Sequence, residues 1–191
     1  MDEVVAKHAT TIDVNLISDN TIIVSDNGRG IPVDNHPKFK NKSALEIIMT
    51  TLHSGGKFTN KNYTTSGGLH GVGASVVNAL SSFMKVEVIR DGYLYVQEFS
   101  RGLPTTPLTK KDKIKKNNGT SITFKPDSEI FGENNLFNPI KIFNMLENKA
   151  YLFKGVQINW KCDVSILKTD ITLPSSKKFC YMNGILDYMK Q

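Results

Sequence analysis

The chain has 191 residues, of which 39% are hydrophobic and 22% are charged, and its formal net charge is +6. It has no apolar run near the ~18–20 residues that a membrane-spanning helix needs, and its start, Met1-Asp2-Glu3, lacks the basic-then-apolar order of a secretory signal. Two cysteines are too few for a disulfide framework or a four-ligand zinc site. We therefore expect a cytoplasmic protein with one domain or two small ones.

The positive charge alone is a weak indication of a nucleic-acid partner. Of the 24 basic residues only three are arginine, namely Arg29, Arg90 and Arg101. Bidentate recognition of phosphate or guanine favours arginine over lysine.

The first predicted elements form a hairpin. Residues 11–16 alternate, with Ile12, Val14 and Leu16 on one face, and residues 21–25 form a second strand after a turn at 18–20. The chain then breaks at 26–32, Asp-Asn-Gly-Arg-Gly-Ile-Pro, where two glycines and a proline prevent regular structure.

Two helices are expected next, separated by a long loop. Ser43 and Glu46 form a capping box for a helix that continues to about Leu52. Residues 54–69 are a loop rich in Gly, Ser, Thr and Asn, and such a long loop in a compact domain is usually functional or disordered. A second helix is expected from about residue 70 to 80.

The rest of the chain predicts strands around one more helix. Strands at 85–90 and 93–100 flank Asp91-Gly92, a strong hairpin signal, and 120–125 alternates as another strand. Asn138-Pro139 opens a helix to about residue 151, 156–160 reads as a strand, and 164–167 as a further one. This mixture with antiparallel hairpins predicts an α+β two-layer sandwich.

Three glycine-rich stretches can carry chemistry. In residues 26–32, the carboxylate of Asp26 lies beside glycines, whose backbone lets a flat base approach closely. It can accept a hydrogen bond from an exocyclic amine of that base, although Asp26 can also be a simple turn cap. The four glycines of 66–73 expose backbone amides at a helix start and suit phosphates, although a flexible hinge is the alternative. Lys57, in 54–58, could reach a phosphate from a lid or be one more solvated lysine.

Other site types are disfavoured by the spacing of their residues. The four histidines lack metal-ligand spacing, and Ser66 is not in a nucleophile elbow. The glycine stretches match neither the dinucleotide fingerprint nor the P-loop.

Taken together, these stretches resemble the ATPase region of the type IIA topoisomerase B subunits. The order and spacing of 26–32, 52–58, 66–73 and 76–80 are similar to that family, and the resemblance spans essentially the whole chain. Residues 59–63 and 179–184 look closer to the B subunit of topoisomerase IV (ParE) than to that of gyrase.

The resemblance implies the Bergerat, or GHKL, fold and an ATP site. It assigns the adenine pocket to Asp26, Gly28, Gly30, Ile31, Pro32 and Thr120. It assigns the lid to Gly55, Gly56, Lys57 and Tyr63, and the phosphate cradle to Gly67, Gly68, Leu69, His70, Gly71, Val72, Gly73 and Ala74. It also implies an ion pair at the pocket rim between Glu3 and Arg29, worth at most about 1 kcal/mol if partly exposed.

The resemblance further implies that residues 1–191 are a single ATPase-type domain. The family's general-base glutamate and Mg²⁺-binding asparagine would precede Met1, so we expect a first helix that is incomplete, no catalytic or metal-binding residue in the chain, and weak turnover. Residues from about 171 to 191 would approach a transducer domain. In the complete enzyme the cofactors would be ATP and Mg²⁺, and the partners DNA, a second B subunit and an A subunit of ParC or GyrA type; the fragment itself would be monomeric.

Two other functions remain open at this point. One is a catalytically inactive nucleotide-binding or interaction module. The other is a different GHKL ATPase, such as a MutL-type repair protein or a sensor histidine kinase, which shares only the short glycine-containing motifs.

Overall fold

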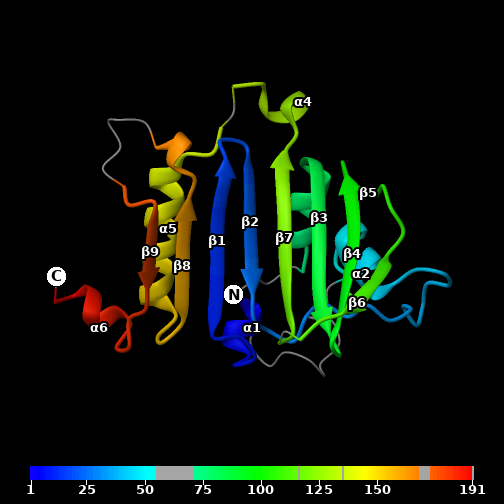
Figure 1. Ribbon diagram of the computed structural model, residues 1–191, viewed down its shortest axis with the longest axis horizontal. Coiled ribbons are helices and arrows are strands. Elements are labelled where there is room, and N and C mark those ends of the chain that lie inside the picture. The colour runs from blue at the N-terminus through cyan, green and yellow to red at the C-terminus, as the bar shows by residue number, and fades with distance from the viewer. Residues whose placement is uncertain (55–70, 116, 135, 168–172, 191) are drawn as a thin grey trace.

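A single mixed sheet dominates the structure. The computed structural model describes residues 1–54, 71–115, 117–134, 136–167 and 173–190. The strands lie in the order β5-β4-β3-β7-β2-β1-β8-β9, with β6 paired to β4 (Figure 1). Their bounds are β1 Thr11–Ser18, β2 Thr21–Asp26, β3 Ser81–Arg90, β4 Tyr93–Ser100, β5 Leu103–Pro104, β6 Thr109–Lys113, β7 Gly119–Pro126, β8 Gln157–Cys162 and β9 Ser176–Phe179. Among the described pairs only β1 with β8 is parallel.

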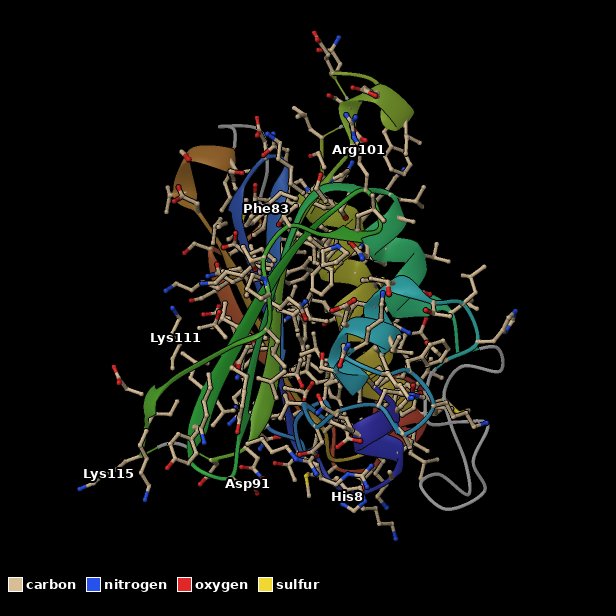
Figure 2. All side chains as sticks on the ribbon, turned by 90° about the vertical axis from the view of Figure 1, so that its right-hand side faces the viewer. His8, Phe83, Asp91, Arg101, Lys111 and Lys115 are labelled. Atoms are coloured by element: carbon tan, nitrogen blue, oxygen red, sulfur yellow. The ribbon has the colours of Figure 1, made fainter. Side chains whose placement is uncertain are left out.

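The main helices cover one face of the sheet and leave the other open, as Figure 2 shows edge-on. The helices are α1 Asp2–Val5, α2 Ala44–Thr50, α3 Gly73–Ala79, α4 Ser128–Phe131, α5 Pro139–Leu152 and α6 Ile185–Tyr188. This architecture confirms the predicted α+β sandwich with a largely antiparallel sheet. Among the described helices, none has the length and apolar character required to cross a membrane.

Two helix starts and one hairpin turn form where the sequence predicts them. Ser43 Oγ accepts from the Glu46 amide at 3.0 Å, and Asn138 Oδ1 accepts from the Lys141 amide at 3.0 Å, so both predicted helix starts are confirmed. Asp91 and Gly92 both have positive φ, 53° and 77°, as a two-residue hairpin turn requires.

Two predictions of secondary structure are wrong in detail. Residues 164–166 form a 3-10 turn and not a strand, because Asp163 accepts from the backbone amide of Ser165 at 2.9 Å and stabilises a turn there. The second helix begins at Gly73, later than the sequence suggests, and ends at Ala79.

The hydrophobic core consists of two clusters on the helix-covered face. The first cluster joins β1, β2, β8 and β9 to α5, and the second joins β3 and β4 to α2. The buried members of the first are Ile12, Val14, Leu16, Ile22, Phe143, Leu146, Ala150, Val156, Ile158, Trp160, Cys162 and Phe179; those of the second are Leu45, Met49, Met84, Val86, Val88 and Phe99. The buried Asn78 donates to the Met49 carbonyl at 2.9 Å and so ties α3 to α2.

The second cluster depends on α2, which packs Leu45 against β3 and β4. Leu45 has no exposed surface, so we expect Leu45→Ala to lower the free energy of unfolding by about 2–5 kcal/mol through lost burial and a residual cavity. The matched control is Leu152→Ala, since Leu152 is 62% exposed, and it should change stability by less than about 0.5 kcal/mol. Urea unfolding measures both, and equal losses would contradict the assignment of Leu45 to the core.

Candidate functional site

The candidate site lies over β2 and β7, between the two core clusters. In β1 and β2, Val14 pairs with Val24 and Ile12 pairs with Asp26, so Val24 and Asp26 face the same side as the buried side chains of β1. Val14 is 4% exposed but Val24 is 36% exposed, although both point to the helix-covered side. The helix layer therefore leaves an apolar side chain uncovered next to Asp26.

The Asp26 carboxylate ends β2 in a partly buried position. Its Oδ1 accepts from the Gly28 amide at 2.8 Å. Burial raises the pKa of Asp26 above its ordinary value; the Gly28 and Thr120 backbone amides oppose this rise, and the negative charge of Glu3 adds to it. Because a partly satisfied carboxylate in such a place gains from an added donor, Asp26 is suited to accept a hydrogen bond from a ligand amine.

Thr120 of β7 joins the carboxylate to the loop that follows it. Thr120 pairs with Asp26 in the sheet, and its hydroxyl accepts from the Ile31 amide at 3.2 Å. One hydroxyl thus fixes the loop at Ile31 directly beside the carboxylate. The resemblance assigns Thr120 to this neighbourhood, and its pairing with Asp26 in the sheet puts it there.

Two glycines allow the backbone to approach closely around this carboxylate. A Cβ at Gly119 would collide with the Asp26 carbonyl oxygen. Gly30 has φ +77°, and a Cβ there would lie 2.8 Å from the Ile89 carbonyl oxygen. Arg90 Nη1 donates to the Gly30 carbonyl at 3.1 Å, which fixes the same loop from β3.

The first helix is attached to the loop by an ion pair. Glu3 accepts from Arg29 through Oε1 to Nη2 at 2.8 Å and through Oε2 to Nε at 3.2 Å, and Oε2 also accepts from the Arg29 backbone amide at 3.0 Å. The Arg29 side chain is 39% exposed and that of Glu3 21%. The ion pair expected between Glu3 and Arg29 is thus present, and it is bidentate.

The structure describes only part of the glycine-rich segments. Gly71, Val72, Gly73 and Ala74 are described, and α3 starts at Gly73, where an added Cβ would meet no described atom within 4 Å. Packing against the described residues therefore does not require glycine at position 73. The remaining lid and cradle residues lie outside the described residues: Gly55, Gly56, Lys57, Tyr63, Gly67, Gly68, Leu69 and His70.

Three contributors to the site were not found by sequence reasoning. Val24 could have been found, because it lies two residues before Asp26 and so shares its face. Asn27 holds the start of β1: its Oδ1 accepts from the amides of Thr10 and Thr11, both at 2.9 Å. Nothing in the sequence indicates that Arg90 reaches Gly30.

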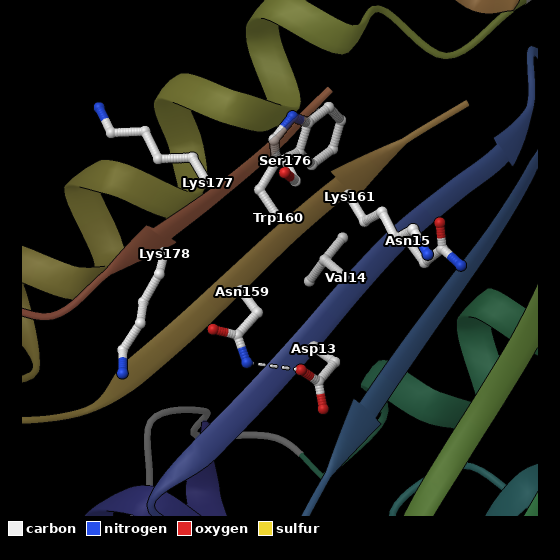
Figure 3. Close-up of a pocket in the computed structure, with 9 residues that line it drawn as sticks. All are labelled: Asp13, Val14, Asn15, Asn159, Trp160, Lys161, Ser176, Lys177 and Lys178. Carbon is white, nitrogen blue, oxygen red and sulfur yellow. Dashed lines mark hydrogen bonds between the residues drawn. The ribbon is translucent and has the colours of Figure 1, made fainter. Parts of the chain in front are cut away.

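A hollow of about 560 Å³ lies elsewhere, over β1, β8 and β9 (Figure 3). It is lined by Asp13, Val14, Asn15, Asn159, Trp160, Lys161, Ser176, Lys177 and Lys178. Asn159 donates to Asp13 at 2.7 Å across its floor. No residue to which the sequence assigns a site role lies there, and it offers neither a glycine loop nor a partly buried carboxylate, so we do not take it as the site.

The described residues around Asp26 are suited to recognise a ligand. They supply a hydrogen-bond acceptor, one neighbouring apolar side chain that is partly exposed, and a closely packed loop. Among them no group of three His, Cys, Asp or Glu side chains gathers in a way that could hold a metal ion.

A family model and two curated relatives match this chain over most or all of its length. The sequence model of the family described as histidine kinase-, DNA gyrase B-, and HSP90-like ATPase matches residues 2–130. The chain is 53% identical to the B subunit of DNA topoisomerase 4 from Bartonella bacilliformis over 189 residues, which are 99% of this chain and 27% of that protein. It is also 53% identical to the corresponding protein of the same name from Caulobacter vibrioides over 191 residues, 100% of this chain and 27% of that protein.

A solved structure resembles the fold over nearly the whole length of this chain. It is the 43K ATPase domain of Thermus thermophilus gyrase B, in complex with an aminocoumarin, with a TM-score of 0.80 and 40% sequence identity. The match covers 98% of this chain and 44% of that chain. The chain spans about a quarter of the length of the curated relatives that it matches.

Burial of Asp26 gives a prediction on stability. Because the pKa of Asp26 is raised above its ordinary value of 3.8, the folded protein retains this proton to higher pH than the unfolded chain. The carboxyl's contribution to the free energy of unfolding therefore falls as pH rises from 3.8 through the folded pKa, and stays at its lower level above it. Asp26→Asn should be more stable than the parent at pH 7.5, with a difference that shrinks toward pH 4.

Thermal unfolding across this pH range measures the difference. Asp112→Asn, which neutralises an exposed carboxylate on β6, is the control and should show no such trend. A less stable Asp26→Asn variant at pH 7.5 would contradict the unfavourable burial of this charge.

The close approach at Gly30 gives a second prediction. Gly30 and Gly155 share φ +77°, but of these two positions a Cβ meets atoms within 4 Å only at Gly30. Gly155→Ala should cost about 1 kcal/mol through backbone strain alone, whereas Gly30→Ala should cost about 1–3 kcal/mol more because the added methyl overpacks the loop. Urea unfolding of both variants isolates the packing term, and equal costs would argue against a tight loop.

Proposed function

The chain belongs to the family of histidine kinase-, DNA gyrase B-, and HSP90-like ATPases, and from that premise we propose that it is the ATP-binding segment of a type II DNA topoisomerase B subunit of the topoisomerase IV kind. The observation that carries the proposal is the partly buried Asp26 carboxylate beside the uncovered Val24. The relatives named as B subunits of DNA topoisomerase 4 support the choice within the family. They also favour it over a MutL-type ATPase or a sensor kinase.

In this proposal Asp26 accepts a hydrogen bond from the adenine 6-amino group. Val24 contacts the base from β2, and the loop residues Gly30, Ile31 and Pro32 contact it from the side. Thr120 keeps the loop in place through the Ile31 amide. The purine is recognised by one directional acceptor on an otherwise apolar surface, which is the usual composition of a small-molecule site.

The triphosphate is proposed to lie toward the start of α3. Gly71, Val72, Gly73 and Ala74 are the described members of the cradle, and their backbone amides would donate to phosphate oxygens. The cradle residues 67–70 and the lid residues Gly55, Gly56, Lys57 and Tyr63 complete this proposal.

The partly buried acceptor and the uncovered apolar side chain fit ATP. For Mg²⁺, which would neutralise phosphate charge, the described residues offer no cluster of ligands, so we assign no residue to it. In the whole subunit, ATP binding and hydrolysis would drive passage of one DNA duplex through another, with DNA, a second B subunit and an A subunit as partners. We place the protein in the cytoplasm. No described residue is assigned as general base.

The test is a thermal shift of the purified 191-residue chain with a non-hydrolysable ATP analogue. Ligand that binds only the folded form raises the melting temperature, and at 100 times Kd the gain is about 2.7 kcal/mol. We expect a clear shift for the parent chain and none for Asp26→Asn, because the new amide N–H₂ would face the adenine amine. Ser25→Ala, on the opposite face of the same strand, should keep the shift.

The matching GTP analogue sharpens the test. Guanine carries a carbonyl oxygen where adenine carries the amine, so two acceptors would face each other at Asp26. We expect affinity about 10- to 100-fold weaker than for the ATP analogue. Equal shifts with both nucleotides, or none with either, would reject the assignment of Asp26. ATP turnover, measured separately, then distinguishes an active segment from a module that only binds.

A further inference from the structure

A run of lysines on β6 is not accounted for by the nucleotide site. Residues 110–116 read Lys-Lys-Asp-Lys-Ile-Lys-Lys, five lysines against one aspartate. The described lysines of the run, Lys110, Lys111, Lys113 and Lys115, are all exposed. None of them makes an ion pair with a described carboxylate, whereas Lys42, Lys85 and Lys177 elsewhere in the chain do.

The run lies on the rim of the sheet and extends to both of its faces. β6 pairs only with β4 among the described strands, and it leads through residues 114–118 into β7. In Figure 2, Lys111 and Lys115 extend from the open side of the sheet, opposite the helix layer. The Lys110 ammonium lies 3.5 Å from the centre of the Tyr93 ring, so this lysine is held against the strand.

Four ammonium groups without a described carboxylate partner concentrate positive charge within six residues of a projecting sheet edge. Lys110 and Lys113 pair with Tyr95 and Tyr93 and share their side of the sheet, whereas Lys111 and Lys115 extend from the other side, so a partner that contacts all four must lie along the edge. Lysine is a compact point charge without the planar fork of arginine, so it suits phosphate contact better than the reading of base edges. The only described acid within the run is Asp112. The complementary partner is therefore a polyanion contacted through its backbone.

We propose that Lys110, Lys111, Lys113 and Lys115, on β6 and directly after it, form a contact along this sheet edge for the phosphate backbone of double-stranded DNA that does not read sequence. The choice of DNA among polyanions rests on the proposed function; the location rests on the lysine run. The competing explanation is that edge lysines only prevent strand-to-strand aggregation, and that explanation predicts no binding to DNA.

Salt dependence measures such a surface directly. The purified chain is titrated onto a fluorescein-labelled duplex of about 30 base pairs and arbitrary sequence, with anisotropy recorded from about 50 to 200 mM salt. Four phosphate contacts predict a log–log slope of about −3.6, which is a loss of about 150-fold in affinity over this range. A second duplex of unrelated sequence should give the same affinity.

The variant Lys111→Gln/Lys113→Gln/Lys115→Gln should flatten the slope to about −0.9, a loss of about 3.5-fold over the same range. The matched control is Lys141→Gln/Lys161→Gln/Lys178→Gln, which removes the same charge from exposed lysines of α5, β8 and β9 at the other end of the sheet. We expect the control to keep the parent slope. If the first variant melts early, Lys111→Gln/Lys115→Gln should still give a slope of about −1.8.

Three results would overturn the proposal: no binding by the parent chain at the lowest salt, equal flattening in both triple variants, or an unchanged slope in the β6 variant. Competition with polyglutamate at equal charge tests an acidic-protein partner. If polyglutamate displaces the parent chain as well as unlabelled duplex does, the assignment to DNA fails. The thermal shift with the ATP analogue should persist in every variant, so loss of that shift alone would count against the proposed function and not against this surface.

Discussion

The structure depends on how a carboxylate is kept partly out of water at the end of a central strand. A buried charge is unfavourable unless donors compensate for it. At Asp26 the donors are backbone amides, from Gly28 and Thr120, and not a cationic side chain. Backbone donors leave the outer lone pairs of the carboxylate free for a ligand, whereas a buried arginine would have occupied them. The close approach of Gly119 and the left-handed Gly30 are the geometric conditions for this arrangement.

The division of the core explains why the site lies where it does. α5 packs on β1, β8 and β9, while α2 packs on β3 and β4. The parallel pairing of β8 with β1 places α5 toward β8, and of β2 only Ile22 is a buried member of the α5 cluster. Among the described helices, none covers Val24 and Asp26 in the middle of the sheet, and Val24 is 36% exposed there. Two well-packed clusters on either side make this gap tolerable for stability.

Elements with strong local signals could be predicted from the sequence, and elements that depend on pairing partners could not. Alternation predicted the first hairpin, and Ser43, Asn138 and Asp91-Gly92 predicted helix starts and a turn, because each acts through its own backbone neighbours. The segment at 164–167 resembled a strand, but the side chain of Asp163 closes a turn there. The edge strands β5, β6 and β9 were missed, since short or lysine-rich sequences carry no apolar alternation. In the site, Asp26 could be predicted as a candidate because it directly precedes a glycine-rich loop. The hydrogen bond from Arg90 to Gly30 could not be predicted, because it depends on how β3 pairs with β7.

The two edges of the sheet show why lysines on a strand need not have the same meaning. On β9, Lys177 makes an ion pair with Glu147 at 3.2 Å, and its ammonium lies 5.1 Å and 4.9 Å from the ring centres of Phe143 and Phe179. The charge of Lys177 is therefore neutralised by a partner within the fold. On β6 the Tyr93 and Tyr95 rings lie near Lys110, and no described carboxylate pairs with any lysine of the run. Lysines on an edge strand also protect it from pairing with another chain. A denser run that is not neutralised repels itself, and this cost is offset when an external polyanion supplies the missing negative charge.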